Sequence, residues 1–278
     1  MIKKRVERES NYSAIFINGK TLRMPLDPKK GIVELKYPEF YDVKLNSICY
    51  GKCKNCYMDS RDTGFNYKAL ENLRIFFEPM NQNQRPFQIA YGGGEPTLHP
   101  DFCSILEYTH SLGIVPNYTT NGMFIDEYNC DKIVEATKKY SMAVALSCHS
   151  HLEIFWKRAA MLFFRNKIKT NFHVIISDKE SVDNFLKIYN EYTGSVLYFV
   201  LLPLTAKGRC KEANVEHEYL FDELSKLDDI KDVAFGANFY PMLKTTKHKF
   251  DLSLYPPEIM SKFLDLKDNK IYKSSFAV

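Results

Sequence analysis

Short apolar runs alternate with amphipathic stretches along most of the chain, from about residue 40 to residue 210. The run at 41–45 alternates apolar and polar positions, whereas later runs are continuous, as in Ala143-Val144-Ala145-Leu146. Continuous apolar runs are typical of parallel strands that are covered on both faces. The predicted strands span residues 41–45, 87–91, 114–119, 142–147, 172–176 and 196–202, and the predicted helices span 67–79, 102–112, 126–139, 151–165 and 182–192.

This alternation of strands and helices predicts an α/β fold with a parallel sheet. Right-handed crossovers would curl such a sheet into a partial (βα)6 barrel of the TIM-like kind, open or closed. No internal repeat and no linker rich in Pro, Gly or Ser interrupts the sequence, so we expect a single domain over residues 1–278. Its core is expected at 40–210, between an N-terminal extension (1–39) and a C-terminal extension (211–278).

Both extensions contain short elements of their own. Within residues 13–24, apolar runs flank Asn18-Gly19, which is a strong signal for a β-hairpin. From Glu216 onward the pattern predicts a helix, then a strand at 232–237, and finally a helix that begins at Pro256-Pro257. We therefore expect an N-terminal β-hairpin and a C-terminal extension of helices and a strand.

Composition narrows the class of protein without identifying it. Hydrophobic residues make up 45% of the 278 residues and charged residues 26%, which excludes a disordered or low-complexity chain. The formal net charge of +4 is mild, so nucleic acid is not indicated as a partner. No apolar run approaches the roughly 18 residues of a membrane helix, and the N-terminus lacks the apolar segment of a signal peptide. We expect a cytoplasmic protein with no membrane contact.

Three of the seven cysteines crowd into eight residues, directly after the first predicted strand. Cys49, Cys53 and Cys56 are thereby placed at the carboxyl ends of the barrel strands, where the active sites of such barrels lie. Their spacing lets three thiolates converge on one centre. The glycine between the first two permits a bend, and neighbouring lysines would stabilise thiolates. These lysines are Lys52 and Lys54.

Two inorganic centres suit three clustered thiols. Structural zinc takes four protein ligands, and the candidates for the fourth, His99 and His149, are remote in the sequence. An iron–sulfur cube also takes four ligands, so three cysteines would leave one iron with the open coordination position that catalysis needs. A non-catalytic zinc-binding α/β module stays open as the alternative to an iron–sulfur enzyme.

Polar and glycine-rich motifs follow the next predicted strands. The second strand leads into Gly92-Gly93-Gly94-Glu95-Pro96, where glycines let the backbone approach a ligand and the carboxylate can accept hydrogen bonds from an ammonium group. The third leads into Thr120-Asn121-Gly122, whose amide offers both a donor and an acceptor. The fourth ends at Ser147, which is followed by Cys148, His149 and His151, each more typical of core or loop positions than of catalysis.

The spacing Cys49-x3-Cys53-x2-Cys56, followed by the aromatic Tyr57, closely resembles the cluster loop of the radical S-adenosylmethionine superfamily. The resemblance implies that the three thiolates hold a 4Fe–4S cluster and that S-adenosylmethionine chelates the fourth iron. One-electron reduction would then break its C5′–S bond and give a 5′-deoxyadenosyl radical, which abstracts hydrogen from a substrate in an oxygen-sensitive reaction. It also implies an electron donor such as flavodoxin or ferredoxin.

The same resemblance covers residues 40–210 and assigns the cofactor-binding residues. Gly93, Gly94 and Glu95 match the family's Gly-Gly-Glu-Pro motif, which holds the methionyl amino group. Asn121 matches the Thr-Asn-Gly of many members, and Ser147 stands where many place a polar residue against the ribose or carboxylate of S-adenosylmethionine.

The stretch from Pro203 to Gly208-Arg209 is similar to that of the peptide-modifying and molybdopterin-related branches. Arg209 could hold a carboxylate or a phosphate, or pair with an acid on the surface. No cysteine follows Cys210, which disfavours the auxiliary clusters common in peptide modifiers. No catalytic residue is assigned, and a peptide, a nucleoside or nucleotide, and a small metabolite all stay open as the substrate.

Overall fold

The computed structural model describes residues 2–277 apart from 126–129, 228–229, 231 and 250–256. Its main sheet has nine strands among the described residues. They are β4 (Phe40–Asn46), β5 (Gln88–Gly93), β6 (Val115–Thr120), β7 (Val144–Ser147), β8 (Thr170–Ile176), β9 (Tyr198–Pro203), β10 (Val233–Phe235), β11 (Ser261–Asp265) and β12 (Lys270–Tyr272).

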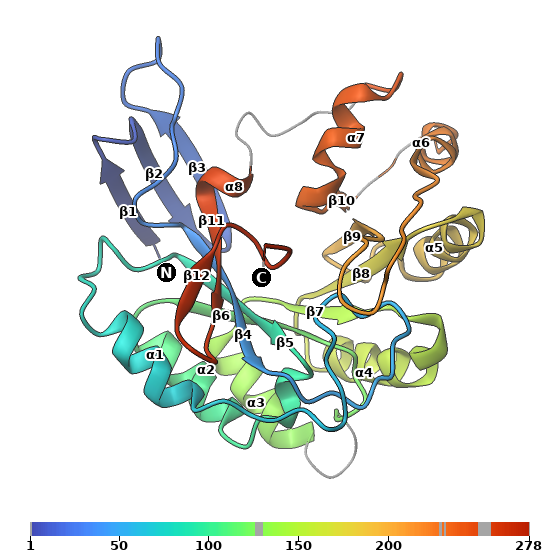
Figure 1. Cartoon of the computed structure of the whole chain (residues 1–278), viewed down its shortest axis with the longest axis horizontal. Coiled ribbons are helices and arrows are strands. Elements are labelled where there is room, and N and C mark those ends of the chain that lie inside the picture. Colours follow the sequence, from blue (N-terminus) through green and yellow to red (C-terminus); the bar gives the residue numbers. More distant parts are fainter. Residues whose placement is uncertain (1, 126–129, 228–229, 231, 250–256, 278) are drawn as a thin grey trace.

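The spatial order of these strands is β10-β9-β8-β7-β6-β5-β4-β11-β12. Every neighbouring pair is parallel except β11 and β12. No pairing between described strands joins β10 to β12, so the curved sheet stays open (Figure 1). The predicted α/β fold with an incomplete parallel barrel is confirmed.

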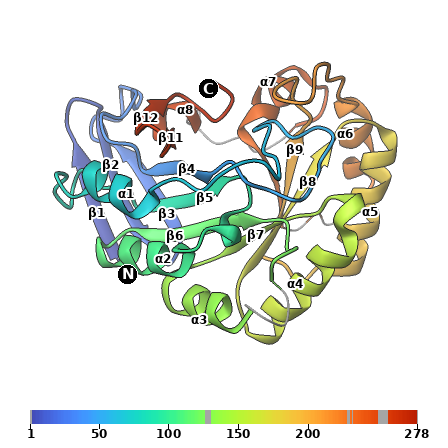
Figure 2. The same ribbon diagram turned by 60° about the horizontal axis from the view of Figure 1, so that its bottom comes forward.

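The helices lie outside the curve of the sheet (Figures 1 and 2). The predicted helices are present, and their ends differ from the prediction by a few residues. Residues 126–129, the predicted start of the third helix, lie outside the described part of the chain. The helices are α1 (Ala69–Phe77), α2 (Phe102–Ser111), α3 (Cys130–Tyr140), α4 (Glu153–Arg165), α5 (Lys179–Tyr192), α6 (His217–Ser225), α7 (Tyr240–Thr245) and α8 (Pro257–Met260), with 3-10 turns at Pro96–Leu98, Ser150–Leu152 and Ala237–Phe239.

The alternating pattern of β4 decides which face of the sheet the helices cover. Tyr41, Val43 and Leu45 are buried on the outer face, and the ring of Tyr41 lies 5.7 and 5.9 Å from two phenylalanine rings of α1. Asp42 and Lys44 point the other way, because side chains alternate along a strand. The inner face of the barrel is therefore partly polar, and it is left open to solvent at positions such as Asp42.

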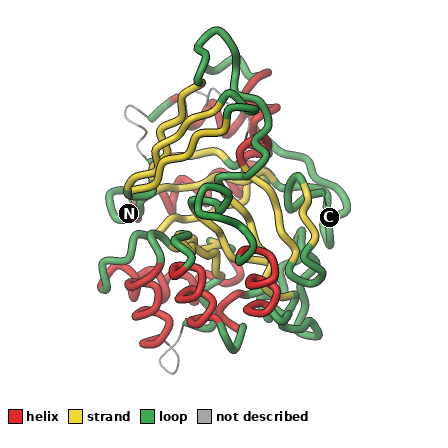
Figure 3. Tube along the Cα trace, turned by 90° about the vertical axis from the view of Figure 1, so that its left-hand side faces the viewer, coloured by secondary structure: helices red, strands yellow, loops and turns green. Residues whose placement is uncertain are grey.

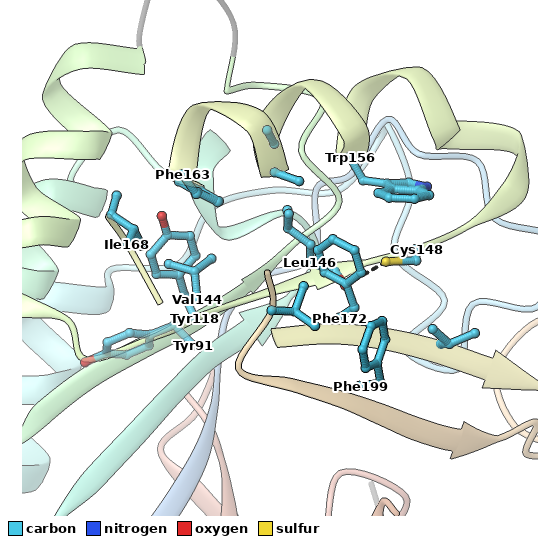
Figure 4. Close-up of a cluster of buried hydrophobic side chains, with 14 of the residues drawn as sticks. Tyr91, Tyr118, Val144, Leu146, Cys148, Trp156, Phe163, Ile168, Phe172 and Phe199 are labelled. Carbon is cyan, nitrogen blue, oxygen red and sulfur yellow. Dashed lines mark hydrogen bonds between the residues drawn. The ribbon is translucent and has the colours of Figure 1, made fainter. Parts of the chain in front are cut away.

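The outer core is built around large aromatic side chains of β6, β8, β9 and α4 (Figure 4). Trp156 is 1% exposed, lies 5.5 Å from the ring of Phe172, and donates a hydrogen bond from Nε1 to the carbonyl of His149. Cys148 lies in the same cluster and is buried. Core packing is thus the observed environment of Cys148.

Truncation of this core gives the first prediction. Replacing Trp156 by Ala should lower the free energy of unfolding by about 3–5 kcal/mol, because it removes a buried ring and leaves a cavity. Urea denaturation measures the loss. Met161→Ala on the same helix is the control, since Met161 is 48% exposed and its truncation should cost less than about 0.5 kcal/mol. Equal losses in the two variants would contradict the assigned packing of α4.

The N-terminal extension forms a sheet of three antiparallel strands instead of a hairpin alone (Figure 3). The strands are β1 (Ile2–Glu7), β2 (Tyr12–Ile17) and β3 (Lys20–Pro25). The turn between β2 and β3 has positive φ at Asn18 and Gly19, as the sequence predicts. The sequence analysis did not predict β1, because several of its residues are charged and apolar and polar positions do not alternate clearly along it. Phe16 stacks on Phe87 at 5.4 Å and so ties this sheet to the barrel.

The C-terminal extension differs most from its prediction. The helix after Glu216, the strand near 233 and the last helix, α8, are present, but α8 has only four residues. The chain continues there as β11, which pairs with β4 over five positions in parallel, and then as β12. Pairing partners more than 200 residues apart override the local signal. Among the described residues, no helix combines the length and apolar character needed to span a bilayer.

Candidate functional site

A loop of twenty residues after β4, here called the cysteine loop (residues 47–66), contains the three clustered cysteines. It is held by backbone hydrogen bonds between its two ends: Ser47 N to Phe65 O (3.0 Å) and Cys49 N to Arg61 O (2.9 Å). A Cβ on Gly64 would lie 2.2 Å from the carbonyl oxygen of Ser47, so only glycine fits that crossing. The loop is thus a closed structure at the carboxyl end of the sheet.

The three thiols are half-buried and influence one another electrostatically. Burial raises the pKa of Cys49 to about 12 and that of Cys53 to about 11, and Cys56 adds to both shifts. The backbone N–H of Gly51 lies 3.4 Å from Cys49 Sγ and opposes the shift. Thiols this close together, with pKa values this high, need a positive centre to hold them as thiolates.

The arrangement suits a cluster better than a single ion. Among the described residues, no group of three His, Cys, Asp or Glu side chains could hold one metal ion. A cube binds each thiolate at a different iron, so it requires neighbouring thiols but not thiols that meet at one point. Three half-buried thiols within mutual electrostatic reach on one loop fit that requirement.

Gly93 and Gly94 bring the end of β5 into contact with the end of β4 and with the cysteine loop, respectively. Gly93 has φ +110°, and a Cβ there would lie 2.6 Å from the carbonyl oxygen of Asn46. At Gly94 a Cβ would lie 2.1 Å from the carbonyl oxygen of Ile48. The backbone N–H of Gly94 donates to Asn46 O (2.9 Å) and that of Glu95 to Ile48 O (2.8 Å). The two glycines thus fit a close backbone approach, Gly93 to the end of β4 and Gly94 to the cysteine loop.

The carboxylate of Glu95 is buried and accepts four hydrogen bonds from the protein. It accepts hydrogen bonds from Thr120 Oγ1 (2.7 Å) and from the backbone N–H of Asn121 (2.9 Å), and it also accepts both the backbone and the hydroxyl donor of Thr97. Burial raises its pKa in spite of these donors. In this structure Glu95 fixes the end of β6.

Asn121 joins the three motifs. Its backbone N–H donates to Glu95, and its side-chain Nδ2 lies 3.5 Å from Cys49 Sγ. Its Oδ1 accepts from the backbone N–H of Met123 at 2.9 Å. Residues that are 26 and 72 positions apart in the sequence are thereby brought to one point.

Ser147 and Tyr57 lie at different sides of the same end of the sheet. Ser147 ends β7, in register with His173 of β8. The ring of Tyr57 stacks on Phe276 at 4.9 Å, which places the C-terminal segment beside the cysteine loop. Burial raises the pKa of Tyr57, and the nearby carboxylate of Asp42 raises it further.

His99 and His149, the two histidines considered for a zinc site, contact other protein groups, and so does the neighbouring His151. The two ring nitrogens of His99 are engaged by the carbonyl of Tyr67 (2.9 Å) and the backbone N–H of Asp101 (3.1 Å). Burial lowers the pKa of His149 to about 4. His151 Nε2 lies 2.9 Å from the carbonyl oxygen of Gly51, so it contacts the cysteine loop through backbone and not through a thiol.

Sequence reasoning placed the positive charge of the loop on the wrong residues. Lys52 and Lys54 are exposed, whereas the cation that lowers the pKa of Cys53 is Arg209, from the loop after β9. Only the Gly-Arg signature of the resemblance drew attention to Arg209, and it did not indicate this partner.

Asp42 gives a pH-dependent prediction for the inner face. Its carboxyl is reached by solvent but surrounded by protein, and desolvation raises its pKa to about 7. The folded state therefore holds this proton more tightly than the unfolded state, whose pKa is about 3.9. The wild type should lose stability relative to Asp42→Asn as pH rises from about 4 to about 7, and no further above that.

Urea unfolding at pH 5 and pH 8 measures this difference. Asp62→Asn is the control, since Asp62 is an exposed residue of the cysteine loop. A stability gap between Asp42→Asn and wild type that is the same at both pH values would contradict the raised pKa.

No family model matches the chain. Over 93 residues it is 29% identical to Fe-coproporphyrin III synthase of Methanosarcina barkeri; the match covers 33% of this chain and 23% of the synthase, so it spans about a quarter of that relative. The structure is similar to that of Streptococcus suis SuiB bound to S-adenosylmethionine, with TM-score 0.70, 15% identity, and coverage of 98% of this chain and 81% of that one.

A second solved structure, native anSMEcpe with bound AdoMet and a peptide, has TM-score 0.57, 17% identity, and coverage of 87% of this chain and 75% of that one. Both of these solved structures contain bound S-adenosylmethionine. The chain therefore has the fold of these two S-adenosylmethionine-binding proteins. The α/β fold that the sequence resemblance implies is confirmed.

Proposed function

We propose that this protein is a radical S-adenosylmethionine enzyme, in which a 4Fe–4S cluster cleaves S-adenosylmethionine reductively and the resulting radical abstracts hydrogen from a substrate. The observation that carries the proposal is the junction at Asn121. It contacts Cys49 through its side chain and Glu95 through its backbone, so three motifs of the superfamily meet at the carboxyl end of one sheet.

Cys49, Cys53 and Cys56 would hold the cluster. When bound, the cluster and S-adenosylmethionine together supply a 5′-deoxyadenosyl radical. The protein contributes position and enclosure: Asn121 and the β5 backbone fix the cysteine loop, and the open inner face gives a substrate access to the same end of the barrel. We assign the backbone at Gly93 and Gly94, with Asn121, to the methionyl end of S-adenosylmethionine.

Glu95 belongs to the same cofactor site, but it acts through others. Its carboxylate is buried and already accepts hydrogen bonds from Thr97, Thr120 and Asn121, so it would position the Asn121 amide instead of binding an ammonium group directly. Ser147 and Tyr57 stand at the rim of the site as further candidates for contact with S-adenosylmethionine.

The inner face does not define the substrate. SuiB has been solved with its precursor peptide SuiA and anSMEcpe with peptides, which supports a peptide as one candidate. The synthase that matches by sequence supports a tetrapyrrole-type metabolite as another. We propose a small reducing protein, such as flavodoxin or ferredoxin, as the electron donor, and the cytoplasm as the location. Whether the overall reaction is an oxidoreduction or a group transfer follows from the substrate.

Anaerobic reconstitution with iron and sulfide tests the proposal. The protein should become brown with about four irons per chain, and dithionite should convert S-adenosylmethionine to 5′-deoxyadenosine and methionine. Protein that binds zinc at one per chain, without sulfide and without cleavage, would overturn the proposal in favour of a zinc-binding module.

A further inference from the structure

Arg209 reaches into the cysteine loop from the opposite side of the barrel. It follows β9, more than 150 positions from Cys53 in the sequence, and its side chain is 23% exposed. Two of its nitrogens, Nε and Nη2, donate to the carbonyl oxygen of Cys53 at 3.0 and 2.8 Å. The third, Nη1, donates to the carbonyl oxygen of Ser60 at 2.7 Å. One guanidinium thus fixes two separate peptide groups of the loop.

The backbone beside it makes the same connection. The N–H of Arg209 donates to the carbonyl oxygen of Cys56 at 3.1 Å. Gly208 has φ +62°, and a Cβ there would lie 2.4 Å from that oxygen and 2.5 Å from the carbonyl oxygen of Tyr57. Gly208 and Arg209 therefore form one contact surface, on which the second and third cysteines of the loop rest through their carbonyl groups.

The charges around this contact do not cancel. Asp59 pairs with Arg209 at 3.2 Å and with Arg61 at 3.0 Å, so one carboxylate faces two guanidinium groups. Arg61 is the outer member, with a side chain that is 59% exposed, and its field is screened by water. Arg209 is the inner member, with a side chain that is 23% exposed and a guanidinium group that donates to the carbonyl oxygen of Cys53. A net positive charge remains beside the second cysteine.

We propose that Arg209 is the positioning residue of the cluster: it holds the loop from Cys53 to Ser60 in place and makes the cluster easier to reduce. The inference rests on the proposed function. A reduced cluster carries one more negative charge than the oxidised one, so a nearby fixed cation stabilises the reduced form and raises the midpoint potential. The fork of donors serves the first role and the charge serves the second.

Two substitutions separate the roles. Arg209→Gln removes the charge and two of the three donors to the loop. Arg209→Lys keeps the charge but cannot span the carbonyl groups of Cys53 and Ser60. Arg61→Gln is the matched control, because the Arg61 side chain contacts Asp59 and no carbonyl group of the loop in the described hydrogen bonds.

The proteins are reconstituted anaerobically, and three quantities are measured: iron and sulfide per chain, the rate of iron loss to a chelator, and the midpoint potential from a redox titration followed by electron paramagnetic resonance. Arg209→Gln should have a more negative midpoint potential than wild type and should lose iron faster. Arg209→Lys should lose iron as fast as Arg209→Gln but keep a potential near that of wild type. Arg61→Gln should resemble wild type in both quantities.

The outcomes distinguish this inference from the proposed function. A wild type without a four-iron cluster would end the proposed function and this inference with it. A wild type that forms the cluster, with Arg209→Gln unchanged in potential and in iron loss, would overturn the inference alone. If Arg209→Gln does not fold, Arg209→Lys decides the positioning role by its rate of iron loss, and wild-type retention in that variant would overturn it.

Discussion

Replacement of Cys53 by Ala is expected to abolish reductive cleavage of S-adenosylmethionine and most cluster binding. The substitution removes one of three protein ligands, so the loss should exceed the roughly 10–100-fold that removal of a ligand's hydrogen-bond partner costs in metalloproteins. The Cys53 side chain donates only a weak hydrogen bond to the carbonyl of Gly51, at 3.8 Å, so its removal should have little effect on folding. The measurements are iron content after reconstitution and 5′-deoxyadenosine released with dithionite.

Cys103→Ala is the matched control for that experiment. Cys103 is also a half-buried free thiol, but it lies on α2, where its sulfur faces the carbonyl of Lys132 at 3.7 Å. The Cys103→Ala variant should bind iron and cleave S-adenosylmethionine as the wild type does. Equal loss in the two variants would show that iron is bound by exposed thiols without selection, and full activity in Cys53→Ala would remove the cysteine loop from the mechanism.

The second large effect is expected at Gly94, directly after β5. Gly94→Ala would place a methyl group 2.1 Å from the carbonyl oxygen of Ile48 and 2.8 Å from Asn46 Oδ1. Neither neighbour can yield easily, because Asn46 is buried and Ile48 O accepts the backbone hydrogen bond of Glu95. Relief of the clash must separate the end of β5 from the cysteine loop, and overpacking of this kind costs about 1–3 kcal/mol or more.

Gly92→Ala, two positions earlier and within β5, supplies the comparison. A methyl group there meets no atom within 4 Å, and the backbone conformation of Gly92 is not of the left-handed kind. We expect Gly92→Ala to retain wild-type stability and cluster content, and Gly94→Ala to lose stability, cluster and binding of S-adenosylmethionine together. Thermal denaturation and equilibrium dialysis with the labelled cofactor measure these losses. Wild-type behaviour of Gly94→Ala would mean that the two segments do not touch.

The two glycines and the three cysteines could be found from the sequence for the same reason. Each motif lies within a few residues of a strand end, so a local pattern of apolar runs and turns places all of them at one edge of a parallel sheet. What could not be read locally is the partner of each polar group. Glu95 was expected to face an ammonium group, but four protein donors occupy its carboxylate.

The same distinction separates the correct and the wrong parts of the fold. The alternation of apolar and polar residues at 41–45 shows which face of that strand the helices cover, because successive side chains point to opposite faces. The continuous apolar runs after it indicate parallel strands that are covered on both faces. The strand β11, between β4 and β12, has no such local signature. It is a strand because β4 offers it an unpaired edge, and that edge exists only after the barrel has formed.

The amino-acid sequence alone therefore determined the repeating strand–helix architecture, the end of the sheet where chemistry would lie, and the three thiols that lie there. The tertiary structure decided which groups hold those thiols in place: Asn121 beside Cys49, the close glycine contacts, and the fork of Arg209 on the carbonyl of Cys53. The physical reason is distance along the chain. Hydrophobic periodicity acts over a few residues, whereas these contacts join segments that are dozens to more than 150 positions apart, and only the folded packing selects them.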